Sequence, residues 1–123
     1  MMVVRFHQQL QNKLIMRIIE RNGFPIPKGY IGITLWPFGI YVIPNIKNSY
    51  TVNHEKIHWA QQKELPVLFY VLYGLFYIVN LCRYKFDTKK AYYAIPFEIE
   101  AYIQEDNTEY LQERYDYAWL KYI

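Results

Sequence analysis

The hydrophobic and polar positions of the first third of the chain follow two different periods. Over residues 3–21, apolar side chains recur at the three- and four-residue spacing of an amphipathic helix, which Gly23–Phe24–Pro25 would end. From Tyr30 to Ile43, β-branched and aromatic residues flank the turn-forming residues 36–39. We therefore expect an N-terminal helix followed by a short β-hairpin.

The pattern after residue 44 is helical. Ser49 or Thr51 can cap a helix that runs through Val52–Leu65 until Pro66 interrupts it. An uncharged stretch at 66–82 and a charged loop at 83–90 follow, and a last helical region runs from about Phe97 to the end. Together these elements predict an α+β fold that is mainly helical, with a single hairpin between its helices.

The uncharged stretch 66–82 bears on the membrane question. Its 17 residues are near the lower limit for crossing a bilayer, but polar groups interrupt it at Tyr73 and Asn80. A helix that is apolar on all sides is also typical of the centre of a small globular fold. We expect a buried helix packed against the preceding one, and insertion into a membrane or association with its surface is the alternative.

Composition and charge narrow the class of protein. Hydrophobic residues make up 53% of the 123 residues and aromatic residues 20%, which excludes a disordered chain and suits one domain over 1–123. Cys82 is the only cysteine, so we expect no internal disulfide. Charged residues interrupt the first twenty positions, so we expect no secretory signal, and both observations favour a cytoplasmic location. Residues 97–123 carry seven acids against Arg114 and Lys121, and no basic run is long enough to indicate a nucleic-acid partner.

The segment His54–Glu55–Lys56–Ile57–His58 is an H-E-x-x-H motif. On a helix its two histidines lie one turn apart on one face, so both imidazoles can reach one metal ion. Glu55 points about 100° away round the helix and can reach a water on the same ion. From the composition of this chain, roughly 0.005 chance occurrences of the motif are expected, so we interpret it as a zinc site. Gln61, on the same face, could orient a histidine or be solvated.

A catalytic zinc needs a third protein ligand. No histidine follows the motif at the required spacing, and His7 precedes it, so a carboxylate is expected. Glu98 is the first candidate, because on a helix it shares a face with Ala101, Tyr102 and Glu105. Glu100 would point to the opposite side and is the second candidate.

With these residues the chain resembles the gluzincin zinc metallopeptidases. The resemblance rests on His54–Glu55–x–x–His58 followed by Glu98–x–x–Ala101, although Tyr102 stands where those enzymes commonly have Asp. The chain is also similar to the minigluzincins and to small zinc peptidases of Bacteroidetes-type bacteria and their phages. The residues shared with the latter are Trp36–Pro37–Phe38, Gln61–Gln62, Glu64, Phe97–Tyr102 and the tail from Arg114 to Trp119.

The resemblance implies a zinc-dependent metalloendopeptidase that cleaves a peptide or protein substrate. Zinc would be held by His54, His58 and Glu98, with Glu55 as general base for the zinc-activated water. The strand at residues 40–43 could hold an extended substrate. The oxyanion donor stays open among Tyr93, Tyr102 and Arg114. The alternative is a non-catalytic protein that is stabilised by zinc or associated with a membrane. Specificity, latency and oligomeric state stay open.

Overall fold

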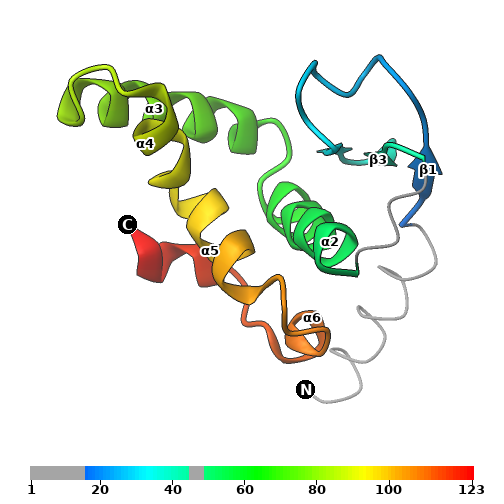
Figure 1. Ribbon diagram of the computed structural model, residues 1–123. Coiled ribbons are helices and arrows are strands. Elements are labelled where there is room, and N and C mark those ends of the chain that lie inside the picture. Colours follow the sequence, from blue (N-terminus) through cyan, green and yellow to red (C-terminus); the bar gives the residue numbers. More distant parts are fainter. Residues whose placement is uncertain (1–15, 45–48) are drawn as a thin grey trace.

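The computed structural model describes residues 16–44 and 49–123 (Figure 1). Within these ranges a small sheet lies beside a group of helices, which confirms the mainly helical α+β class. The strands are β1 (Ile18–Glu20), β2 (Gly32–Leu35) and β3 (Gly39–Val42). The helices are α2 (Ser49–Glu64), α3 (Leu68–Arg83), α4 (Thr88–Tyr93), α5 (Pro96–Gln104) and α6 (Tyr110–Glu113), followed by the 3-10 helix η1 (Ala118–Tyr122).

The sheet has the order β1-β3-β2 and contains the expected hairpin of β2 and β3. β1 pairs in parallel with β3, so the helix predicted over 3–21 is wrong at Ile18–Glu20. The part of that prediction over residues 1–15 lies outside the described residues. The strand forms because Ile18 and Ile19 are β-branched and β3 offers them a free edge. Backbone hydrogen bonds from Ile40 to Arg17 and from Arg21 to Val42 close both ends of this pairing.

One face of the sheet packs on α2. Ile40 and Val42 are buried against Trp59, and their partners across the hairpin are Thr34 and Gly32. A Cβ atom at Gly32 would lie 3.4 Å from Cγ of Glu55 and 3.1 Å from the carbonyl oxygen of Tyr41. The absence of a side chain at this position therefore lets α2 lie close beneath the strand, and it brings Glu55 up to β2.

α3 is buried on one side only, so the prediction of a buried helix is wrong for its other face. Phe69, Leu72 and Phe76 pack in a cluster with Ile95, Phe97 and Trp119. The opposite side is exposed and apolar, and it comprises Leu68, Val71, Leu75, Ile78 and Val79. The helix packs mainly against α4 and the cluster with η1, because α2 and α3 diverge sharply after Pro66. The short chain has no further described element to cover the second face.

The region from Phe97 onward is not one helix. α5 ends at Gln104, where the side-chain amide of Asn53 donates to the carbonyl oxygens of Gln104, Glu105 and Asn107. α6 and η1 follow as separate short elements. The predicted charged loop 83–90 is shorter than expected, because the helix α4 begins within it at Thr88, with its first turn capped by the side chain of Asp87.

Among the described residues, no single helix has both the length and the apolar character needed to cross a bilayer. The two segments Tyr50–Glu64 and Leu68–Arg83, bent by 112° at their junction, together meet that test by length and composition.

Candidate metal centre

α2 and α5 lie side by side and bring three side chains to one point. Nε2 of His54 and Nε2 of His58 are 3.2 Å apart. Oε1 of Glu98 lies 3.2 Å from the first nitrogen and 3.0 Å from the second. All three side chains are buried. The two histidines and Glu98 therefore form a nearly equilateral triangle of possible ligand atoms.

The hydrogen bonds of His58 determine which of its nitrogens carries the proton. Its Nδ1 lies 2.8 Å from Oε1 of Gln61. The amide nitrogen of Gln61 donates to the carbonyl oxygen of Phe97 and to Oε1 of Glu100, both at 2.9 Å, which fixes the orientation of the amide. The amide oxygen must then accept from Nδ1–H of His58, so Nε2 of the neutral ring presents its lone pair to the triangle.

His54 is oriented in the same way by a different residue. Its Nδ1 lies 2.9 Å from Oε2 of Glu105, which can only accept a hydrogen bond when ionised. Nε2 of the neutral ring is therefore also a lone-pair donor directed at the triangle. The ring of Tyr102 packs edge-on against His54, with centroids 4.3 Å apart. Glu105 thus orients His54 through a hydrogen bond, whereas Tyr102 contributes packing.

The second oxygen of Glu98 is held by α3. The hydroxyl of Tyr73 donates to Oε2 of Glu98 at 2.7 Å, so Oε1 alone faces the histidines. Burial and the adjacent Glu98 carboxylate raise the pKa of Tyr73, which keeps this hydroxyl protonated and donating. Neither the spacing nor the composition of the sequence indicated this role for Tyr73.

Without a cation the triangle is electrostatically coupled. Burial alone would lower the pKa of His58, but the charge of Glu98 and their hydrogen bond outweigh it and raise the pKa to about 9. Burial alone would raise the pKa of Glu98, but the charge of His58 and hydrogen bonds from both histidines hold it well below its usual range. The three atoms thus require a positive charge between them, either a proton or a metal ion.

The geometry suits a small tetrahedral metal ion. Nitrogen and oxygen ligands at about 2.0–2.1 Å from such an ion are roughly 3.3 Å apart. The three observed separations of 3.0–3.2 Å are close to this value. Each ligand is also oriented by a second hydrogen bond, from Glu105, Gln61 or Tyr73, as is usual for protein metal sites.

Glu55 lies beside the triangle on the side of the sheet. His54, Glu55 and His58 each place a ligand atom within 4.8 Å of the others, close enough to share a metal ion. The hydroxyl of Thr34 on β2 lies 3.1 Å from Oε1 of Glu55 and 2.9 Å from its backbone oxygen. The hydrogen bond from Thr34 holds the Glu55 carboxylate near the triangle. The oxygen that lies against both histidines nevertheless belongs to Glu98. No motif or spacing in the sequence indicated that Thr34 would hold the Glu55 carboxylate.

A hollow of about 100 Å³ adjoins His54 and Glu55. Its other lining residues are Tyr30, Ile31, Gly32, Thr51, Tyr92, Tyr102 and Glu105. A volume of this size holds about three water molecules, so the hollow admits a water or a small part of a larger ligand.

The strand beside this hollow is β2. The prediction that residues 40–43 hold a substrate is wrong, because β3 is the central strand and both of its edges are paired. Residues 31, 33 and 35 face β3, so the backbone groups of Gly32, Thr34 and Trp36 face away from it. Gln62 bonds the last two, accepting from Trp36 N–H and donating to the oxygen of Thr34. Gly32 remains beside the hollow.

Glu100 belongs to a separate buried cluster on the far side of Gln61. Its Oε2 accepts from the hydroxyl of Tyr110 and from Nε of Arg114, both at 2.6 Å. Arg114 also pairs with both oxygens of Glu64. Glu100 is therefore not at the triangle, and neither is Arg114. Its position excludes Arg114 from the oxyanion donors that the sequence left open. Tyr93 contacts the rings of Tyr92 and Tyr102.

Comparison with protein-family models, with curated proteins and with solved structures finds no match for this chain.

Proposed function

We propose that the protein is a zinc-dependent metallopeptidase of the gluzincin type. In this proposal zinc is held by His54, His58 and Glu98, and Glu55 acts as the general base. The observation that carries the proposal is the triangle of three buried acceptor atoms, each oriented by its own hydrogen-bond partner, with a further buried carboxylate beside it.

The residues of the chain support this chemistry in distinct ways. Zinc bound in such a site lowers the pKa of the water that it binds to about 7 and polarises the carbonyl group of the substrate. Glu55 would accept the proton of the attacking water and return it to the leaving amine. Thr34 orients the Glu55 carboxylate, and Gln61 and Glu105 keep the lone pairs of the two histidines directed at one point.

The outer edge of β2 at Gly32 is the natural place for the substrate. An extended peptide can add to a sheet edge through backbone hydrogen bonds, and Gly32 presents such groups next to the hollow and Glu55. This position replaces the strand at 40–43. Tyr102 lines the same hollow, and burial raises its pKa to about 12, so its hydroxyl stays protonated and is the candidate donor to a developing oxyanion.

A non-catalytic zinc protein is the second candidate. It is favoured by the small volume of the hollow and by the burial of His54, His58 and Glu98. In that case zinc would tie α2 to α5 and contribute only to the stability of the fold.

Metal analysis together with peptide hydrolysis separates the two candidates. We expect one zinc per chain in the wild type, loss of zinc in Glu98→Gln, and retained zinc in Glu55→Gln. The Glu55→Gln variant should lose peptide hydrolysis by about 10²–10⁴-fold, because an amide cannot accept the proton. Substrate would be a mixture of denatured proteins, with cleavage followed by mass spectrometry.

Two further variants serve as controls. Glu113→Gln changes an exposed glutamate and should keep both zinc and activity. Glu100→Gln changes a buried one and should keep zinc. Zinc without hydrolysis in the wild type would favour the structural role, and a Glu55→Gln variant as active as the wild type would refute the general-base assignment.

A further inference from the structure

The exposed side of α3 is a continuous apolar surface. The helix has 16 residues and is about 24 Å long. At about 100° per residue, six of its exposed positions fall within an arc of about 100°. These six, called here the α3 stripe, are Leu68, Val71, Leu75, Ile78, Val79 and Cys82. No charged residue lies on the helix before Arg83.

The α3 stripe ends in a group of basic residues. Arg83, Lys85, Lys89 and Lys90 are exposed, and Asp87 is the only acid among residues 83–90. None of the four bases forms an ion pair with another described residue. Phe86 lies between them with 73% of its surface exposed and a φ of 64°, a conformation that residues other than glycine rarely adopt. The backbone thus presents a large aromatic ring to solvent beside four cations.

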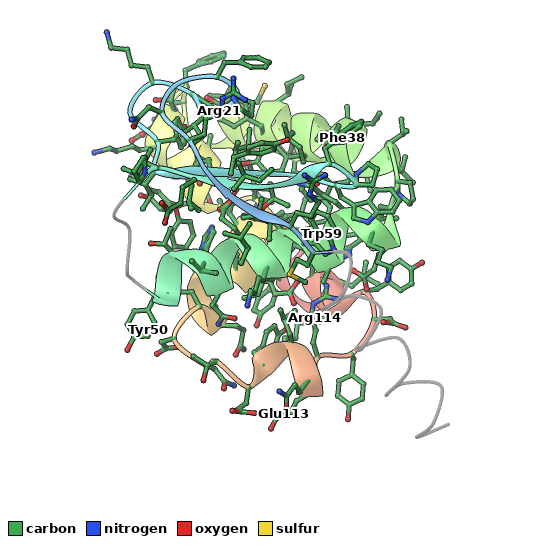
Figure 2. All side chains as sticks on the ribbon, turned by 90° about the vertical axis from the view of Figure 1, so that its right-hand side faces the viewer. Arg21, Phe38, Tyr50, Trp59, Glu113 and Arg114 are labelled. Carbon is green, nitrogen blue, oxygen red and sulfur yellow. The ribbon has the colours of Figure 1, made fainter. Side chains whose placement is uncertain are left out.

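The basic residues after α3 and the acidic residues around α6 lie toward opposite ends of the molecule. α3 lies at the top of Figure 1 and α6 at the bottom. In Figure 2, Arg21 is at the top and Glu113 at the bottom. The chain after residue 104 contains Glu105, Asp106, Glu109, Glu113 and Asp116. The apolar stripe and its bases are therefore at the end of the molecule opposite α6 and its Glu113.

We propose that the α3 stripe and the basic turn after it dock on the surface of an anionic lipid bilayer. The apolar side chains would enter the interface, and Arg83, Lys85, Lys89 and Lys90 would meet the lipid phosphates. Phe86 suits the boundary between the two. A second copy of the chain is a poorer occupant, because the stripe and turn offer only Asp87 to balance four bases. This proposal is independent of the proposed peptidase activity.

Sedimentation of the purified protein with vesicles tests the docking. We expect binding to vesicles of phosphatidylcholine that contain about a third phosphatidylglycerol, weaker binding to phosphatidylcholine alone, and a decrease at high salt. Ile78→Gln should lower the partition coefficient about tenfold. Lys89→Gln should lower it about fivefold on the anionic vesicles only.

Matched controls distinguish docking from general effects. Ile103 on α5 is 54% exposed and Ile78 is 57% exposed, so Ile103→Gln removes a comparable side chain elsewhere and should leave binding unchanged. Lys121→Gln is the corresponding control for Lys89→Gln. Equal effects of the two isoleucine variants, or no binding at low salt, would overturn the proposal. A concentration-dependent dimer that Ile78→Gln dissolves without lipid would assign the α3 stripe to a second copy.

Discussion

Two buried polar clusters flank Gln61, and they differ in how their charges are balanced. On one side, Glu64 and Glu100 meet the guanidinium of Arg114 in direct ion pairs. On the other side, Glu98 meets two imidazoles whose Nδ1 protons are committed to Glu105 and Gln61. Gln61 bonds to both clusters, through His58 and through Glu100.

The difference indicates what each cluster is for. The Arg114 cluster contains its own cation and needs nothing else, so it stabilises the packing of the C-terminal segment on α2 and α5. The His54–His58–Glu98 cluster places three acceptors within 3.2 Å of one another and has no permanent cation of its own. A buried group of acceptors is stable only when a proton or a metal ion balances it. The first cluster is therefore structural, and the second suits an exchangeable cation.

Removing Arg114 should have the largest effect on stability. Arg114→Met leaves Glu100 buried without its counter-charge, and we expect a loss of about 3–5 kcal/mol in the free energy of unfolding by urea denaturation. The control Lys121→Met, at an exposed position, should change it by less than about 0.5 kcal/mol. Adding Glu100→Gln to Arg114→Met should restore part of the loss, and a double variant no more stable than the single one would contradict the charge argument.

The two clusters should respond to pH in opposite directions. In the metal-free protein the pKa of His58 is raised to about 9 from 6.5, so its contribution to stability is complete below pH 6.5 and is lost as the pH rises through 9. The loss is at most about 3 kcal/mol. Burial raises the pKa of Glu100, but its hydrogen bonds and ion pair with Arg114 lower it by more, so the net shift is downward. The contribution of Glu100 to stability is therefore present above the ordinary carboxyl pKa and is lost in acid.

Urea denaturation across this pH range, with and without zinc, measures the effect. Zinc should reverse the alkaline trend, because a proton and the metal compete for Nε2 of His58. A metal-free protein that is equally stable at pH 6.5 and pH 9 would refute the coupling between His58 and Glu98.

Replacing Gln61 should have a smaller and more specific effect. Gln61→Met removes the acceptor that orients His58, and we expect zinc affinity to fall about 10–100-fold. Gln62→Met is the matched control, because Gln62 is also buried but its hydrogen bonds within the described part of the chain go to Thr34, Trp36 and Tyr70. It should destabilise the fold and leave zinc affinity nearly unchanged. Equal losses of affinity in the two variants would mean that Gln61 acts through stability alone.

Local periodicity made much of the candidate site predictable. Residues four apart on a helix share a face, so His54 and His58 could be paired from the sequence, and Gln61 could be placed on their face. The same argument put Glu98 and Glu105 on one face of α5 and Glu100 on the other. The hairpin was predictable because its β-branched residues flank a clear turn. The strand at Ile18–Glu20 was not, because its pairing depends on β3, about twenty residues later.

The sequence alone therefore determined which residues can act together within one element. Only the tertiary structure decided which faces meet: that Glu98 turns toward the histidines, that Thr34 and Tyr73 hold the carboxylates of Glu55 and Glu98, and that the α3 stripe stays exposed. The physical reason is that helical and strand periods fix directions around a single axis. The element that covers each face is determined by packing between segments far apart in the chain.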